Sequence, residues 1–114
     1  MLHIFFHVAV PLTVAFVFYR PRETQAGLIM IATMVVDLDH LLADPIYNPE
    51  RCSIGFHPLH TVPTIVVYAL VFALALLFAK RLEGSGLGSA VRLLHLGSLG
   101  LLIHMALDWG DCLV

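Results

Sequence analysis

Two aspartates and a histidine lie close together at the end of an apolar segment. The segment begins at Gly27, and its later part, from Met34 to His40, reads Met-Val-Val-Asp-Leu-Asp-His. In hydrocarbon an ionised carboxylate is costly and usually faces a partner, a cavity or a metal ion. Asp37 and Asp39 therefore need polar company, and other histidines and carboxylates of the chain are expected to lie near them.

The composition is typical of a membrane protein. Of the 114 residues, 60% are hydrophobic and 12% are charged, whereas a soluble domain carries about 25% charged residues. A chain of this length forms a single domain, residues 1–114. Its net charge of −2 provides no basic field for nucleic acid, so no nucleic-acid partner is expected.

Four apolar segments predict an all-α fold, an integral membrane four-helix bundle. They cover about residues 2–19, 25–43, 61–79 and 90–109, and about 20 apolar residues cross a bilayer. The first segment lacks the basic stretch of a signal peptide, so it is expected to be retained as a helix. In the fourth, Gly97, Ser98 and Gly100 are small residues of the kind that allow membrane helices to approach closely.

The basic residues predict the orientation of the bundle. Five of the six lie in or beside the first and third loops, and the sixth, Arg51, lies in the middle loop. The five are Arg20, Arg22, Lys80, Arg81 and Arg92. Because basic residues are enriched in cytoplasmic loops, both ends of the chain and the middle loop are expected outside the cytoplasm.

With this topology, most ionisable side chains gather at the extracytoplasmic end. Six of the seven histidines and six of the eight acidic residues fall there, while His95 falls at the other end. The four segments are defined without reference to the histidines, so this gathering independently indicates a shared site. We expect Asp44, Glu50 and Asp111 to be solvated and His95 to be interfacial.

Helical spacing places several of these groups on common faces. Two pairs stand four residues apart and share a face, His3 with His7 and His104 with Asp108, with Asp111 one turn further. Asp37 and His40 also share a face, whereas Asp39 points elsewhere unless the end of the helix unwinds. Structural roles are the alternatives: an interface for His3, a hydrogen-bonded pair for His104 and Asp108, and solvation for His57.

Imidazole and carboxylate ligands together favour zinc, manganese or iron over calcium. The predicted metal ligands are His3, His7, Asp37, Asp39, His60, His104 and Asp108. A set of this size, with carboxylates able to bridge, suits one or two divalent ions, zinc first and manganese or iron as alternatives. A two-metal centre activates water and stabilises a phosphoryl or acyl oxygen. The predicted catalytic residues are Asp37, His40 and His57, the histidines serving proton transfer.

The two cysteines, Cys52 and Cys112, fall on the same side of the predicted bundle. Disulfides persist outside the cytoplasm, so a bridge between them is one interpretation. Free thiols and contact with the metal are the others.

Three motifs resemble those of YdjM-like membrane-bound metal-dependent hydrolases. They are Asp-Leu-Asp-His at 37–40, Leu-His-Thr at 59–61 and His-Met-Ala-Leu-Asp at 104–108. A small uncharacterised bacterial family with a Cys-Ser-Ile-Gly-Phe-His-Pro-Leu-His loop is also similar, which implies a bacterial inner membrane protein. The pattern is distantly similar to that of zinc-dependent phospholipase C and P1-type nucleases, which are soluble helical enzymes.

The resemblance implies specific ligand roles. His7 would be the ligand on the first helix, Asp39 the central bridging aspartate, His60 a middle ligand, and His104 with Asp108 the last pair. The YdjM-like proteins carry a further histidine where this chain has Gly55, and His57 is the nearest substitute here. Ligands for the third metal of the soluble enzymes have no counterpart in the sequence.

These observations predict metal-dependent hydrolysis of a lipid-borne ester, a phosphoester first, at the outer leaflet. The alternative is a membrane protein that binds or translocates metal without catalysis, although a transporter needs polar residues across the bilayer. A b-type haem protein is a third interpretation, and the crowd of carboxylates disfavours it. The sequence leaves the substrate open, and whether the chain forms a homo-oligomer.

Overall fold

The computed structural model describes residues 2–42, 52 and 54–113, and these residues are helices and connecting turns without any strand. In chain order the elements are α1 (Leu2–Phe18), α2 (Glu23–Ala32), the 3₁₀ helix η1 (Thr33–Leu42), the short 3₁₀ helix η2 (Pro58–His60), α3 (Val62–Ala79) and α4 (Gly88–Leu113). The all-α prediction is confirmed.

Three stretches are long and apolar enough to cross a membrane: Glu23–Leu42, Val62–Ala79 and Gly88–Leu113. At about 1.5 Å per residue, the 18 residues of α3 extend about 27 Å, close to the thickness of a bilayer core. The apolar α1 has 17 residues and falls short of this group. Length and composition therefore support three of the four predicted spans.

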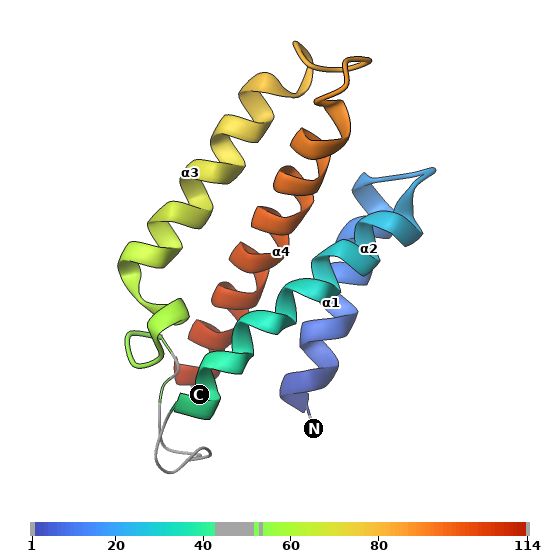
Figure 1. Ribbon diagram of the computed structural model, residues 1–114. Helices are drawn as coiled ribbons and strands as arrows, with labels where there is room; N and C mark the ends of the chain where they lie inside the picture. The colour runs from blue at the N-terminus through green and yellow to red at the C-terminus, as the bar shows by residue number, and fades with distance from the viewer. Residues whose placement is uncertain (1, 43–51, 53, 114) are drawn as a thin grey trace.

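Helix α4 holds the molecule together, because α1, α2, η1 and α3 all pack against it (Figure 1). The hydrophobic core lies where α1, α2 and α4 meet, and consists of Ala15, Ala26, Met30 and Leu96. Both ends of the described chain lie at one end of the bundle, and the α1–α2 and α3–α4 turns lie at the other (Figure 1).

Small residues set the distance between these helices. A Cβ atom at Gly100 would lie 2.8 Å from the Met30 Cα and 2.8 Å from the Thr33 Oγ1, so α4 touches the junction of α2 and η1 through bare backbone. At Gly97 a Cβ would meet no described atom within 4 Å. The prediction of close approach is therefore confirmed at Gly100 and wrong at Gly97.

The predicted second helix, residues 25–43, is wrong in type over its second half. The α-helix ends at Ala32, and the chain continues as a 3₁₀ helix to Leu42. Runs of 3₁₀ helix beyond three or four residues are uncommon because their hydrogen bonds are poorer. Residues two apart are about 160° apart around an α-helix but about 120° apart around a 3₁₀ helix. The change thus turns Asp39 towards the side of Asp37.

The fourth helix, α4, is longer than the predicted 90–109 and runs from Gly88 to Leu113. Asp111 and Cys112 therefore lie within the helix. Cys112 forms a disulfide with Cys52, and their Cα atoms are 5.2 Å apart. Of the three interpretations of the cysteines, the bridge is the one found. It fastens the end of the middle loop to α4. The sidedness expected for Arg51 and the solvation expected for Asp44 and Glu50 concern residues outside the described ranges.

Candidate metal centre

Four separate elements bring their histidines and aspartates to the end of the bundle where the chain termini meet. They are α1 with His3 and His7, η1 with Asp37, Asp39 and His40, the η2 region with His57 and His60, and α4 with His104 and Asp108. All nine residues predicted from the sequence are thus gathered in one region. Their roles as ligands or catalysts stay predictions.

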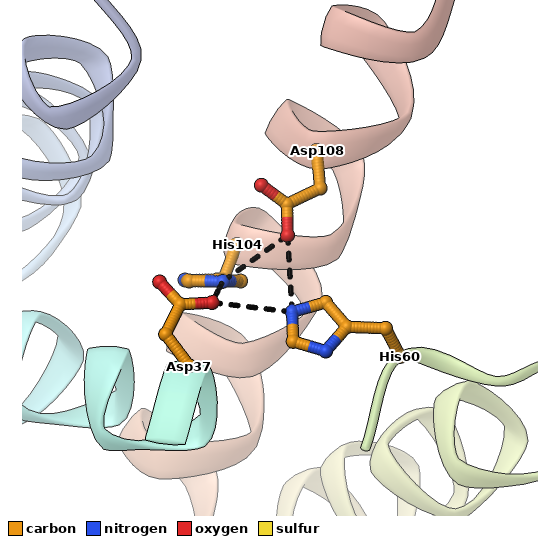
Figure 2. A group of neighbouring side chains, drawn as sticks. All are labelled: Asp37, His60, His104 and Asp108. Carbon is orange, nitrogen blue, oxygen red and sulfur yellow. Dashed lines mark hydrogen bonds and ion pairs between the residues drawn. The ribbon is translucent and has the colours of Figure 1, made fainter. Parts of the chain in front are cut away.

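The central group consists of Asp37, His60, His104 and Asp108, whose side chains point towards one another from three elements (Figure 2). The Nε2 atom of His104 lies 3.0 Å from the Asp37 Oδ1 and 3.3 Å from the Asp108 Oδ2. The Nε2 atom of His60 lies 3.3 Å from the same Asp37 oxygen and 3.1 Å from the same Asp108 oxygen.

These separations fit a tetrahedral metal site. Ligand atoms that lie about 2.0–2.1 Å from a tetrahedral zinc ion are about 3.3 Å from one another. The two nitrogens and two carboxylate oxygens of the central group are the donor types that zinc takes, and the two carboxylates would balance the charge of a divalent ion. The donor set and its spacing therefore fit a bound divalent metal.

Several atoms of this region are buried without a hydrogen-bond partner among the described residues. They are His7 Nε2, His60 Nε2, His104 Nδ1 and both oxygens of Asp108. The Nε2 atoms of His7 and His60 lie 3.0 and 3.1 Å from the Asp108 oxygens without forming hydrogen bonds to them. A buried polar atom without a partner is costly. A cation bound between the two Nε2 atoms and the Asp108 oxygens would remove that cost for these four atoms, though not for His104 Nδ1, because His104 faces the central group through its Nε2.

Asp39 orients His60. Its Oδ2 accepts hydrogen bonds from the backbone N–H of Leu59 at 2.8 Å and from the His60 Nδ1 at 3.0 Å. With the proton on Nδ1, the lone pair of the His60 Nε2 is directed at the central group. A carboxylate behind a metal-bound histidine commonly fixes the tautomer and ring orientation in this way. Asp39, predicted as a bridging ligand, thus lies behind the central group, and Asp37 lies within it.

A second group joins the first through Asp108. It consists of His3, His7 and Asp108. The His7 Nδ1 donates to the backbone carbonyl of His3 at 2.7 Å, which leaves its Nε2 to face the Asp108 Oδ1 at 3.0 Å. Since the other oxygen of Asp108 faces the central group, this carboxylate contacts both groups and would be shared by them if each held a cation. His3 is also paired with Asp111, an exposed residue expected to be solvated.

A third group lies on the other side of His60 and consists of Asp39, His40 and His57. The His40 Nδ1 lies 3.0 Å from the Asp39 Oδ1, and the His40 ring stacks on the His57 ring with centroids 3.7 Å apart. His57 is buried, so the solvated alternative for it is wrong. This burial could not be predicted from the sequence, because it comes from contact between η1 and the residues before η2.

The electrostatics of His60 reflect the carboxylates around it. Burial lowers the pKa of its imidazole, but the contacts with Asp108, Asp37 and Asp39 outweigh burial and raise that pKa to about 10. A side chain that is fully buried, with an exposed fraction of 0%, thus sits in a strongly negative field. The field that holds a proton on His60 attracts a divalent cation in the same way.

His95 is separate from this region. Its Nε2 is hydrogen-bonded to the Tyr19 hydroxyl at 2.6 Å, and its ring packs against Phe72. It lies at the opposite end of α4 from His104, as the sequence predicted. It therefore serves as a natural control for the histidines of the metal centre.

The fold and the site define a class: an all-α protein with apolar helices of membrane-spanning length and a buried histidine–aspartate cluster at one end. The chain belongs to a family of unknown function (DUF6122), whose model matches residues 1–114. Comparison with curated proteins and comparison with solved structures each find no match.

Proposed function

We propose that this protein is a membrane-embedded, metal-dependent hydrolase that acts on a lipid-borne ester, a phosphoester first. The observation that carries the proposal is the convergence of buried ligand atoms that have no hydrogen-bond partner among the described residues: the Nε2 atoms of His7 and His60 and both oxygens of Asp108. The resemblance of the 37–40, 59–61 and 104–108 motifs to those of membrane-bound hydrolases favours hydrolysis over simple metal storage.

Zinc suits the donor set best, with manganese and iron as alternatives, and the bridging position of Asp108 favours two ions. When bound, the metal supplies Lewis acidity that activates water and stabilises charge on a phosphoryl oxygen. The chain's own task is to hold the ligands. Asp39 fixes the ring of His60, and the backbone carbonyl of His3 fixes the ring of His7.

Asp37 is the exposed member of the central group, and His40 beside it is also partly exposed. The side chains of His60, His104 and Asp108 are at most 3% exposed, whereas those of Asp37 and His40 are 31% and 28% exposed. The His40 Nδ1 lies 3.6 Å from the Asp37 Oδ1, so a partly exposed imidazole lies beside the central group. It is positioned to exchange a proton there, with His57 stacked against it.

A lipid substrate is favoured by the surface around the centre. Leu38, Leu41 and Trp109 are exposed apolar neighbours of the site residues in sequence. In a membrane such side chains contact lipid, so lipid esters reach Asp37 and His40 at high local concentration. Basic residues at the opposite end favour an orientation with the metal centre outside the cytoplasm. The Cys52–Cys112 disulfide agrees with that orientation, in a bacterial inner membrane.

The second candidate function is metal binding without catalysis, or metal transport. Transport is disfavoured by the core between the two ends of the bundle, where Ala15, Ala26, Met30 and Leu96 pack together. These apolar side chains offer no ligands for an ion that leaves the centre. Binding without catalysis differs from hydrolysis in having no open coordination position for water.

The proposal is tested on the purified protein by elemental analysis and by release of headgroups from phospholipid vesicles. We expect one or two divalent ions per chain, and hydrolysis that a chelator abolishes and zinc restores. His40→Gln is expected to keep the metal but to slow hydrolysis at least tenfold. Absence of metal after incubation with zinc would defeat both candidate functions. If the protein binds metal but hydrolyses no tested phospholipid or acyl ester, the hydrolase proposal is wrong and metal binding without catalysis remains.

A further inference from the structure

An open cavity of about 740 Å³ lies at the end of the bundle opposite the metal centre. It is bounded by the end of α1, the turn that leads to α2, the end of α3 and the first turns of α4. The α1–α2 turn and the α3–α4 turn thus both contribute to the cavity, and Figure 1 shows them at the same end of the bundle. No residue of the metal centre lines it.

The lining of this cavity is strongly basic. Four basic residues line it, Arg20, Arg22, Lys80 and Arg92, against one acidic residue, Glu83. Gly88 and Ser89 at the start of α4 also line it, and the positive end of a helix dipole attracts anions, while the Gly88 N–H itself donates to the Ser85 carbonyl. Charge and helix dipole therefore both favour an anion here.

Arg92 is a cation of the cavity lining whose side chain is held in place by a neighbouring residue. Its Nε donates to the Gln25 Oε1 at 3.0 Å, which fixes the direction of the guanidinium group. Its Nη2 is buried and has no hydrogen-bond partner in the described part of the chain. Arginine presents several N–H donors in one plane, a geometry that matches phosphate oxygens. Because Arg92 lines the cavity, its guanidinium group is the kind of donor that a phosphate bound there would use.

The remaining lining residues favour the phosphate of a lipid over a free phosphate ion. Phe18, Ala79 and Val91 add apolar surface beside the basic residues, and the hydrogen-bonded Tyr19 and His95 add a polar one. The cavity is in the size range of sites for whole small ligands, far larger than one phosphate ion. It also opens at the ends of two membrane-spanning helices, α3 and α4, where lipid headgroups lie. Basic pockets in such positions bind anionic headgroups.

We propose that the cavity between the α1–α2 and α3–α4 turns binds the phosphate of an anionic phospholipid, with Arg92 and Arg22 as its main contacts. The lipid would come from the leaflet at this end of the bundle. Binding there would hold the two turns together and leave the metal content unchanged.

The test is lipid binding by the full chain in detergent, with phosphatidylglycerol, phosphatidylcholine and inorganic phosphate as probes. Native mass spectrometry is expected to find one tightly bound phosphatidylglycerol. A basic contact near a membrane contributes about 1 kcal/mol, which is about fivefold in affinity. Arg22→Gln is therefore expected to weaken binding about fivefold, and Arg92→Gln at least as much. Arg81→Gln is the matched control, because Arg81 is exposed in the α3–α4 turn and does not line the cavity.

The outcomes separate cleanly. Equal weakening by Arg81→Gln, or equal affinity for phosphatidylcholine, would show general attraction to the membrane and overturn the site. Displacement of the lipid by millimolar inorganic phosphate would assign the cavity to the free ion and overturn the lipid. If Arg92→Gln fails to fold, Arg22→Gln decides alone, because Arg22 is exposed at the start of α2. Unchanged binding in a folded Arg22→Gln protein would also contradict the proposal.

Discussion

The carboxylate of Asp108 faces two histidines through its two oxygens. His7 lies 3.0 Å from its Oδ1 and His60 lies 3.1 Å from its Oδ2, while the side chain is 2% exposed. With their Nδ1 protons donated elsewhere, the facing Nε2 atoms of both histidines carry lone pairs when neutral. Lone pairs that face a buried carboxylate need protons or a cation between them. Asp108 is therefore the residue that couples the two groups.

Asp108→Asn keeps the shape of this side chain and removes its charge. We expect the variant to lose most of its bound metal, because one ligand of each group is weakened. The rise in melting temperature on adding zinc should vanish with it, a loss of about 2.7 kcal/mol for an ion present at 100 times its Kd. Elemental analysis and thermal unfolding measure the two effects. His95→Gln, at the other end of α4, should retain its metal. Full metal occupancy in Asp108→Asn would remove this residue from the site.

Asp39→Asn separates a positioning residue from a ligand. Asp39 accepts from His60 and Leu59 on the side away from the central group, so its charge is expected to act through His60. Loss of such an orienting carboxylate lowers metal affinity about 10- to 100-fold without abolishing binding. Calorimetric titration with zinc should find this intermediate affinity, while Asp37→Asn should bind more weakly still. If Asp39→Asn binds no metal at all, Asp39 is a direct ligand.

At the scale of elements, η1 and α4 form the frame of the centre. Asp37 comes from η1, and His104 and Asp108 come from α4, so the distance between these helices sets the size of the central group. That distance depends on Gly100, whose missing side chain leaves room for Met30 and Thr33. A contact made four residues before His104 thus controls the ligand geometry.

Gly100→Ala is expected to destabilise the protein and to reduce bound metal. The added Cβ would lie 2.8 Å from a backbone atom that cannot move aside, so the helices must separate. Overpacking of this kind costs about 1–3 kcal/mol. The measurements are thermal unfolding and metal content. Gly97→Ala, at a position open to at least 4 Å, should be neutral or slightly stabilising because alanine favours helix. Equal effects of the two substitutions would contradict this account.

Sequence reasoning succeeds for these elements where the signal is local. Long apolar segments gave α3 and α4, and the spacing of His104 and Asp108 placed both in one group. The 3₁₀ form of η1 was not predicted, because 3₁₀ helices of ten residues are uncommon and an apolar segment continuous with α2 favours an α-helix. In the 3₁₀ conformation Asp39 accepts hydrogen bonds from Leu59 and His60. These contacts join residues about 20 positions apart in the sequence, so a local pattern does not predict them. The stacking of His57 on His40 also joins residues distant in the sequence and could not be predicted from it.

At the scale of the whole molecule, the bundle has two chemically different ends. The histidine–aspartate groups lie at one end and the basic cavity at the other, with the apolar core of Ala15, Ala26, Met30 and Leu96 between them. The longest dimension of the molecule is 47 Å, enough to place the two ends in opposite headgroup regions of one bilayer. We expect this chemical difference between the two ends to give the proposed membrane protein one direction in the bilayer.

That direction is tested by labelling an introduced cysteine. The two native cysteines are joined in a disulfide, so Ser85→Cys in the α3–α4 turn would carry the free thiol. Ser85 is exposed in that turn. Because basic residues favour the cytoplasmic side, a membrane-impermeant maleimide should label this variant in inverted vesicles and leave it unlabelled in intact cells. Labelling in intact cells would reverse the orientation and place the metal centre on the cytoplasmic side.

The pairing of α1 with the end of α4 has a consequence for biosynthesis. His3 and Asp111 contact each other across 108 residues of sequence, and His7 faces Asp108 between the same two helices. Ribosomes synthesise α1 first, so its histidines emerge seconds before the carboxylates of α4 exist. The group of side chains is complete only after α4 has been synthesised. On the proposed function, a metal ion would therefore be bound only after α4 is made, from the compartment that this end of the protein faces, and a chain truncated before α4 would lack His104 and Asp108.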